Sequence, residues 1–458
     1  MYREDTIAAI ATPPGEGGVA IVRISGVDAE AIAARTFVRP AGKNGRLKSH
    51  TLYHGSIRDS QRDQVLDEAL LTIMRRPRSY TGEDVVEIHC HGGTFVVGRI
   101  LGLVLREGAR QAEPGEFTKR AFLNGRIDLA QAEAVLDLIR ARTEKGADLA
   151  LDQVSGVLSQ WVAQLRDELL DILVQTEAAI DFPEEEIELL RRPELIGKIR
   201  GLVEKISDIS GTYDWGKLYR EGARVCICGR PNVGKSSLLN ALLGENRVIV
   251  TPVAGTTRDV IEESISLDGL PAVLWDTAGI RESDNDIERI GVDLSLQHVA
   301  RADAVLAVVD GSEPFATEDE VLLAGIPSEK VLLAVNKLDL PQRLDARDLE
   351  RLAGSSTVRS ISARTGEGIP QLKKSLRDLL IDREMETSIA ITNLRHRSAL
   401  QRSASSLSRA ASSLVESYAP EFVAMDLNEA RVALEEITGV IHTDDILERI
   451  FANFCIGK

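Results

Sequence analysis

A glycine-rich segment near the middle of the chain has the residue types and spacing that bind phosphate. Residues 229–236 read Gly-Arg-Pro-Asn-Val-Gly-Lys-Ser and lie between an apolar run and a stretch with leucines at helical spacing. In a strand–turn–helix setting, backbone N–H groups close around a phosphate, the lysine supplies a cation and the serine hydroxyl can ligate Mg²⁺. The predicted nucleotide contacts here are Asn232, Val233, Gly234, Lys235, Ser236 and Ser237.

Three further motifs follow in order, each directly after an apolar run that predicts a strand. Asp276 can hold the Mg²⁺ shell, and Asp339 can accept two hydrogen bonds from guanine N1–H and the exocyclic amine, which adenine does not offer. A backbone N–H near Ala363 can meet guanine O6. Four motifs in this order predict a GTP-binding domain. Its other predicted contacts are Thr251, Thr256, Thr257, Thr277, Ala278, Gly279, Asn336, Lys337, Ser362 and Arg364.

The predicted GTPase domain lacks a familiar catalytic side chain. Ile280 stands where Ras-like enzymes carry the glutamine that orients the attacking water. Hydrolysis must therefore draw on another group or be slow. The acidic residues downstream are candidates, although they also fit a solvated loop: Glu282, Asp284, Asp286 and Glu288. Residues 251–259 lie where the first switch belongs and offer a threonine hydroxyl and several carbonyls.

Length and composition bound the class of protein. A chain of 458 residues fits about three domains, and no apolar run reaches the roughly 18 residues of a membrane span. The net charge of −16 argues against a broad nucleic-acid-coating surface but permits a local basic patch. The cysteines, which include Cys226 and Cys228 on one predicted core strand, show no zinc-like spacing, so we expect a reducing cytoplasm.

The periodicity changes twice along the chain. Up to about residue 120 it predicts an α+β domain, in which the adjacent His89, Cys90 and His91 fit core or turn packing better than a metal site, because neighbouring strand residues point to opposite faces. From Asp128, a predicted N-cap, helical spacing takes over and a long pattern spans 151–173. Predicted strands lie at 6–11, 19–24, 69–74 and 85–89, and predicted later helices at 395–418 and 427–437.

Helical patterns on both sides of the nucleotide motifs predict a multidomain fold. The simplest arrangement is a discontinuous helical bundle, with an α/β nucleotide domain inserted between its two halves. The predicted boundaries are 1–120 for the N-terminal domain, 121–218 for the first helical part, 219–382 for the GTPase domain and 383–458 for the second helical part.

The chain resembles the MnmE (TrmE) family of tRNA modification GTPases along essentially its whole length. The strings outside the GTP motifs are the specific part of this resemblance. They are ATPPG at 11–15 with GG at 17–18, YTGED at 80–84, RAFLNG at 120–125, LAQAE at 129–133, DFP at 181–183, GTTRD at 255–259 and FCIGK at 454–458.

The resemblance implies a fold and an activity. The family combines a folate-binding N-terminal domain, a helical domain from central and C-terminal segments, and an inserted Ras-like P-loop GTPase domain. It implies a cytoplasmic homodimer formed through the N-terminal domains. With an FAD-dependent partner, MnmG, in a heterotetramer-type complex, the family adds an aminomethyl or carboxymethylaminomethyl group to C5 of the wobble uridine (U34) of certain tRNAs. A reduced folate, 5,10-methylene- or 5-formyl-tetrahydrofolate, is the implied cofactor.

The resemblance also implies roles for individual residues. Mg²⁺ would be bound by Ser236 and Thr257, and Glu288 would orient the water in place of the missing glutamine. Cys455 would matter for modification. The implied K⁺ site is Asn232, Thr251, Val253 and Thr256, and the implied folate contacts are Arg23, Glu87, Arg126 (where the family often has lysine) and Lys458.

A ribosome-assembly GTPase that binds rRNA is the alternative function. It would share the GTP motifs and the missing glutamine. The acidic balance and the lack of an appended RNA-binding motif count against it.

Overall fold

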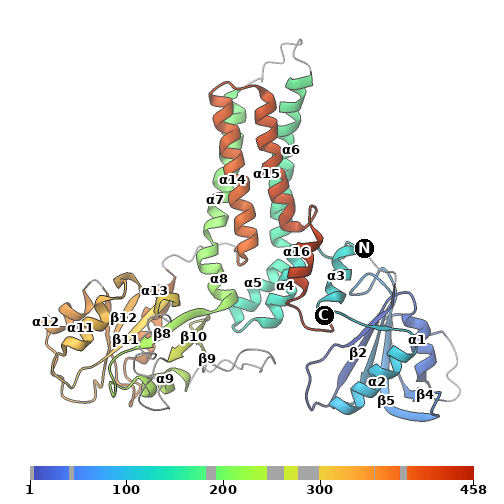
Figure 1. The fold of residues 1–458 in the computed structure, drawn as a ribbon, viewed down its shortest axis with the longest axis horizontal. Coiled ribbons are helices and arrows are strands. Elements are labelled where there is room, and N and C mark those ends of the chain that lie inside the picture. The colour runs from blue at the N-terminus through green and yellow to red at the C-terminus, as the bar shows by residue number, and fades with distance from the viewer. Residues whose placement is uncertain are drawn as a thin grey trace. The chain divides into compact units, whose positions relative to one another are not determined.

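The computed structural model describes residues 5–40, 46–181, 192–244, 262–276, 299–354, 356–381 and 389–458. The chain divides into two compact units, which we call unit 1 and unit 2 (Figure 1). Unit 1 contains Met1–Leu136 and Glu435–Lys458, whereas unit 2 contains Asp137–Leu434. The polypeptide therefore leaves unit 1, forms all of unit 2 and then returns.

Unit 1 contains a seven-stranded sheet with the order β3-β4-β5-β6-β2-β1-β7. Neighbouring strands are antiparallel except for β1 and β7, which are parallel. The four strands predicted in this part of the chain are confirmed as β1, β2, β5 and β6. The strands span Ile7–Ile10 (β1), Ala20–Ser25 (β2), Phe37–Val38 (β3), Leu52–Asp59 (β4), Gln64–Met74 (β5), Val85–Cys90 (β6) and Arg110–Gln111 (β7).

Strand β4 is not anticipated by the sequence pattern because a glycine interrupts it. A Cβ at Gly55 would lie 2.5 Å from the carbonyl oxygen of Val38 and 2.6 Å from the ring of Phe37. The glycine therefore lets β3 approach closely. A residue with poor strand propensity is favoured here by tertiary packing.

Helices α1 and α2 cover one face of this sheet (Figure 1). Because successive strand residues point to opposite faces, Val22 and Ile24 pack in the core with Ile100 of α2. Arg23 and its cross-strand partner Glu87 point to the other face. The two helices span Ala29–Thr36 (α1) and Thr94–Arg106 (α2).

The last described residues of the chain belong to unit 1. Helix α16 packs against α3, and a β-bridge joins Pro114 to Ile456. The N–H of Gly115 donates to the carbonyl of Cys455 at 3.4 Å. The helices span Glu116–Leu123 (α3), Leu129–Arg140 (α4) and Asp444–Phe451 (α16).

Two predicted helix starts and stops can be compared with the structure. Asp128 is confirmed as a cap of α4, because its carboxylate accepts from the N–H of Gln131 at 2.9 Å. The pattern at 151–173 is not one continuous helix as its spacing suggests. It is broken at Gly156, whose φ of 91° lies outside the helical region and starts a new helix.

Unit 2 contains long helices contributed from both sides of the nucleotide motifs. Helices α6 and α7 lie beside α14 and α15 (Figure 1), and α7 packs along α14. This confirms a discontinuous helical bundle. The helices of this part span Glu144–Val154 (α5), Val157–Asp181 (α6), Arg192–Gly211 (α7), Tyr213–Glu221 (α8), Leu394–Val415 (α14) and Pro420–Thr438 (α15).

The inserted domain contains a six-stranded sheet with the order β13-β12-β11-β8-β10-β9. All strands are parallel except β9, which pairs antiparallel with β10. All residues of β11 and β12 are buried, as expected of central parallel strands. The elements span Ala223–Cys228 (β8), Lys235–Leu243 (α9), Glu262–Leu267 (β9), Leu270–Asp276 (β10), Ala304–Asp310 (β11), Thr317–Ala324 (α11), Ser328–Lys330 (η2), Val331–Asn336 (β12), Ala346–Ala353 (α12), Thr357–Ser360 (β13) and Ile369–Leu380 (α13).

The sequence-based boundaries stay predictions. Residues 120 and 218 fall inside α3 and α8, and residue 382 lies outside the described residues. Among the described helices, none has the length and apolar character needed to cross a membrane.

Candidate functional site

The phosphate-binding segment is a tight loop between β8 and α9. Gly229 (φ 147°) and Gly234 (φ 98°) both have positive φ values. A Cβ at Gly229 would lie 2.3 Å from the carbonyl oxygen of Val308, and one at Gly234 would lie 2.3 Å from Nδ2 of Asn336. Both positions therefore require glycine. The loop places the N-terminus of α9, with its partial positive charge, beside the carboxyl end of β8.

The first residues of α9 carry the side chains predicted to meet phosphate and Mg²⁺. The ammonium of Lys235 donates to the carbonyls of Gly229 and Arg230 at 2.9 and 2.7 Å, so it lies over the loop. Ser236 and Ser237 are exposed in the first turn, which fits a hydroxyl that ligates Mg²⁺. Asn232 is also exposed, with a φ of 65°.

Asn336 joins three of the predicted motifs. Its Nδ2 donates to the carbonyl of Val233 in the phosphate loop at 2.8 Å. Its Oδ1 accepts from the N–H of Ala363 at 2.9 Å. Because the side chain is 2% exposed, water does not compete for these bonds. Asn336 is therefore a brace between the loop that faces phosphate and the loop that faces the base.

Asp339 presents an ionised carboxylate next to this brace. Its Oδ1 accepts from the hydroxyl of Ser362 at 2.5 Å, and its Oδ2 lies 2.6 Å from a guanidinium nitrogen of Arg364. The hydrogen bond from Ser362, helped by Arg364, lowers the pKa of Asp339. A carboxylate held in this form is the acceptor that guanine N1–H and its amine need.

Lys337 is fixed by a buried acid. Its ammonium lies 2.5 Å from Oδ2 of Asp310. The other carboxylate oxygen of Asp310, Oδ1, accepts from the N–H and from the hydroxyl of Ser312. Burial alone would raise the pKa of Asp310, but the hydrogen bonds from Lys337 and Ser312 outweigh it and lower that pKa. Lys337 has a φ of 66°, a backbone conformation that residues other than glycine rarely adopt.

Several of the predicted nucleotide, metal and catalytic residues lie partly or wholly outside the part of the chain that the structure describes. Asp276 ends β10, at the same sheet edge as the phosphate loop, but its side chain is not described. The others lie wholly outside the described residues: Thr251, Val253, Thr256, Thr257, Thr277, Ala278, Gly279 and Glu288.

A second polar cluster lies in unit 1, on the sheet face that α1 and α2 leave open. Nε of Arg23 donates to Oε1 of Glu87 at 2.9 Å, and another Arg23 nitrogen donates to the carbonyl of Gly457 at 3.2 Å. The guanidinium also lies 5.4 Å from the ring centroid of Tyr80 and 5.7 Å from that of Phe117. Strand pairing thus joins residues far apart in sequence into one charged, aromatic-lined cluster.

The remaining predicted folate contacts differ in how they join this cluster. Lys458 is half-buried, and burial, with the nearby charge of Arg23, lowers its pKa even though Glu87 acts in the opposite sense. Arg126 is exposed and donates to the carbonyl of Ser79 at 3.1 Å, beside Tyr80 rather than to the other predicted residues. Cys455 is an exposed free thiol.

Sequence reasoning missed Tyr80, Phe117 and Gly457 as parts of this cluster. Tyr80 begins the string YTGED, so its position in a specific string was the available signal. Gly457 has a φ of 99°, and a Cβ there would lie 2.3 Å from the carbonyl of Ile10. The tail can therefore reach Arg23 only with a glycine at this position.

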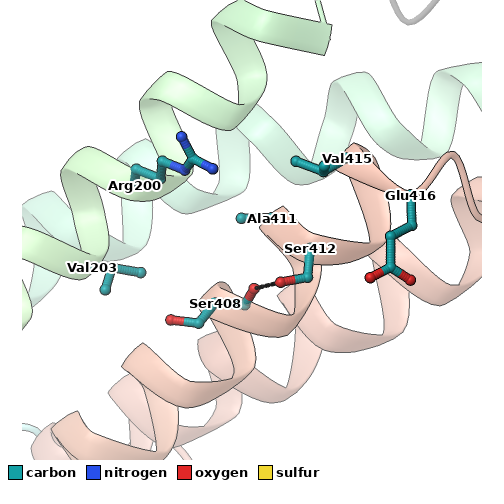
Figure 2. A pocket seen from close by; sticks show the side chains of 7 residues that line it. All are labelled: Arg200, Val203, Ser408, Ala411, Ser412, Val415 and Glu416. Atoms are coloured by element: carbon teal, nitrogen blue, oxygen red, sulfur yellow. Dashed lines mark hydrogen bonds between the residues drawn. The ribbon is translucent and has the colours of Figure 1, made fainter.

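A pocket of about 360 Å³ lies in the helical bundle, between α7 and α14. Figure 2 shows Arg200 and Val203 of α7 facing Ser408, Ala411 and Ser412 of α14. The Ser412 hydroxyl donates to the carbonyl of Ser408, as in many helices. None of the predicted site residues lines this pocket.

Removing the side chain of Asn336 is expected to weaken both loops that it joins. Asn336→Ala leaves the carbonyl of Val233 and the N–H of Ala363 without their partner, which costs about 1–3 kcal/mol for a buried group. We expect this loss to lower the affinity for GTP about 10- to 100-fold. Titration with a fluorescent GTP analogue measures the affinity. Asn428→Ala, on α15, is the control. Unchanged GTP affinity in Asn336→Ala would contradict the bracing role.

The parallel sheet, the glycine-dependent loop at the N-terminus of α9 and the acceptor at Asp339 define a P-loop nucleotide-binding domain with a guanine-type base site. Comparison with known proteins extends this to the whole chain. Residues 129–455 match the family described as the MnmE helical domain, and residues 6–126 match the GTP-binding protein TrmE N-terminus.

Curated relatives agree along the full length. The chain is 47% identical to the tRNA modification GTPase MnmE of Syntrophus aciditrophicus over 99% of this chain and 100% of the relative. It is also 47% identical to that of Geobacter sulfurreducens over 100% of both. Among solved structures, the G domain of the T. maritima FeoB iron transporter is 29% identical, covers 34% of this chain and 98% of that chain, and has a TM-score of 0.27. The chain belongs to the MnmE family of tRNA modification GTPases.

Proposed function

We propose that this protein hydrolyses GTP to drive modification of C5 of the wobble uridine of certain tRNAs. A GTPase acting in tRNA modification is what family membership supports. The finer proposal is that it works with the FAD-dependent partner MnmG and adds an aminomethyl or carboxymethylaminomethyl group. The observation that carries it is the second polar cluster at Arg23, because a GTP-dependent binding module has no need of one.

The guanine site supplies the switch in this proposal. Asp339 would select GTP, Asn336 would keep the base and phosphate loops in register, and Lys235 would move from the loop carbonyls onto the phosphates. Mg²⁺, held by Ser236 and Thr257, would neutralise charge on the phosphates. K⁺, held by Asn232, Thr251, Val253 and Thr256, would neutralise charge on the phosphoryl group that is transferred. Glu288 would orient the attacking water.

The cluster at Arg23 would hold the one-carbon donor. A reduced folate has a polar, hydrogen-bonding ring and an anionic glutamate tail. The pair Arg23–Glu87 offers both donors and an acceptor, and the Tyr80 ring offers a flat apolar surface. Lys458 adds a cation at the same place, whereas Arg126 would reach the ligand from the Ser79 side. These residues fit the proposed ligand.

The proposal includes the assembly expected of the family. The protein would form a homodimer through its N-terminal domain, bind MnmG and tRNA, and act in the cytoplasm. The exposed Cys455, two residues from the Gly457 carbonyl that accepts from Arg23, would lie near the one-carbon donor.

Folate binding by the full chain tests the proposal. Arg23→Gln removes the ion pair with Glu87, and we expect affinity for 5-formyl-tetrahydrofolate to fall at least about 10-fold, as for loss of a charge-assisted hydrogen bond. GTP hydrolysis should be unchanged, because Arg23 lies in unit 1. Isothermal titration calorimetry measures the first quantity and phosphate release the second.

Arg35→Gln is the matched control, since Arg35 pairs with Glu107 on the helix-covered side of the same sheet. A thermal melt of each variant separates lost binding from lost folding. If the native chain binds no reduced folate, the modification proposal fails and the ribosome-assembly alternative gains. If Arg23→Gln binds the folate as tightly as the native chain does, Arg23 is not a folate contact.

A further inference from the structure

A pocket of about 560 Å³ lies in unit 1 between α2 and the β4–β5 hairpin. Its lining comes from residues 59–66 of the hairpin and from residues 94–106 of α2. Because α2 covers the sheet face opposite to Arg23, this pocket is separate from the second polar cluster. It contains none of the residues assigned above to GTP or folate.

The wall of this pocket is basic, in a chain whose net charge is −16. Three arginines line it, Arg62, Arg99 and Arg106, against a single acid, Asp59. Asp59 has a side chain only 3% exposed and accepts from Arg106 at 2.7 Å, so it anchors the arginine rather than facing solvent. The side chains of Arg62 and Arg106 are 68% and 44% exposed. Each guanidinium has five donors, and most remain available to an anionic ligand.

An exposed aromatic ring stands beside these charges. Phe95 is 76% exposed, and the Arg99 guanidinium lies 5.8 Å from its ring centroid. An aromatic side chain among basic residues is the platform on which unpaired bases stack, while the arginines meet the phosphates.

Two glycines keep the space next to Phe95 open. Gly98 and Gly102 lie three and seven residues after Phe95, on the same outer side of α2, and both line the pocket. Glycine inside a helix costs about 1 kcal/mol relative to alanine. A Cβ at Gly98 would meet nothing within 4 Å, so internal packing does not explain this glycine. With these two glycines the helix is less stable than it would be with alanine, and the missing side chains leave a trough on its surface.

We propose that this pocket docks an unpaired nucleotide of the tRNA substrate. Its base stacks on Phe95 and enters the trough at Gly98, and the flanking phosphates contact the arginines. The inference rests on the proposed function, which makes tRNA the substrate. Since the folate cluster lies on the opposite face of the sheet, the pocket binds and orients tRNA and does not take part in the chemistry.

Binding of an unmodified tRNA transcript with a wobble uridine, followed by fluorescence anisotropy with the full chain, tests this site. Phe95→Ala should weaken binding about 5- to 100-fold, as for loss of one stacked base. Arg62→Gln and Arg99→Gln should each make the negative slope of log K against log salt concentration shallower by about 0.7. Gly98→Gln should fill the trough and weaken binding, while the helix gains propensity and the protein melts no earlier.

The control variants are Phe422→Ala, an exposed aromatic of α15 that is 57% exposed, and Arg166→Gln of α6. Native-like binding by Phe95→Ala and Gly98→Gln would overturn the proposal, as would a native chain that binds no transcript. A change in oligomeric state with unchanged tRNA affinity would assign the pocket to a protein interface instead. Failure of the pocket proposal can be distinguished from failure of the proposed function by analysing the wobble nucleosides of a strain that lacks the gene for this protein. If native protein and Phe95→Ala restore the modified nucleoside equally well, the pocket proposal is rejected and the proposed function is retained.

Discussion

Asp339→Asn is expected to weaken GTP binding about 100- to 1,000-fold. The carboxylate of Asp339 is ionised and held by Ser362 and Arg364, so it can accept from both guanine N1–H and the exocyclic amine. An asparagine keeps one acceptor and sets an NH₂ group against the amine, so two charge-assisted hydrogen bonds of about 1.5–3 kcal/mol each are weakened or lost. Equilibrium titration with a fluorescent GTP analogue measures the change.

The same variant should gain relative affinity for xanthosine triphosphate. That nucleotide carries a carbonyl oxygen where guanine has its amine, and the asparagine NH₂ can donate to it. Asp378→Asn, an exposed position on α13 of the same domain, is the control and should leave both affinities unchanged. If Asp339→Asn binds GTP as the native chain does, the base is not recognised at Asp339.

Gly234→Ala is expected to abolish measurable nucleotide binding. The added Cβ would lie 2.3 Å from Nδ2 of Asn336, and the φ of 98° is strained for any residue with a Cβ. Relief requires the loop to move away from Asn336, which breaks the brace and misdirects the N–H groups that meet phosphate. A loss of about 1–3 kcal/mol in the free energy of unfolding should accompany this strain. GTP binding and urea unfolding measure the two effects.

Gly201→Ala tests whether any glycine substitution has this effect. Gly201 lies inside α7, and a Cβ there would meet nothing within 4 Å. We expect this variant to bind GTP normally and to be up to about 1 kcal/mol more stable, because alanine favours the helix. A Gly234→Ala protein that retained GTP affinity would mean that the loop adopts a different conformation when it binds.

The nucleotide site could be predicted largely from local sequence. Its residues follow strands in short, ordered motifs, and the carboxyl ends of parallel strands bring such motifs to one edge. The sequence did not show that Asn336 spans from Val233 to Ala363, because that contact depends on how β8 and β12 are spaced in the sheet. Motif order identifies the ligand class, and strand order determines the geometry.

The cluster at Arg23 depends on contacts that no local pattern encodes. Arg23 and Glu87 meet through the pairing of β2 with β6, and Gly457 reaches Arg23 from the other end of the chain. The family resemblance implied Arg23, Glu87 and Lys458 as members of this cluster. The place of Tyr80 depends on the contact of its ring with the guanidinium of Arg23, which only the folded chain brings about. The break at Gly156 was similarly hidden, because apolar spacing continues across it while the backbone does not.

The nested path of the chain sets an order of assembly during synthesis. The contacts of unit 1 with residues 435–458, which include the bond from Arg23 to Gly457, can form only after all of unit 2 has been made. Bringing Ile456 to Pro114 while the 341 intervening residues are unfolded would carry a large loop-closure cost, growing with the logarithm of the loop length. Prior folding of unit 2 shortens the effective loop. Translation would thus complete the GTP-binding domain first and leave the Arg23 cluster until last.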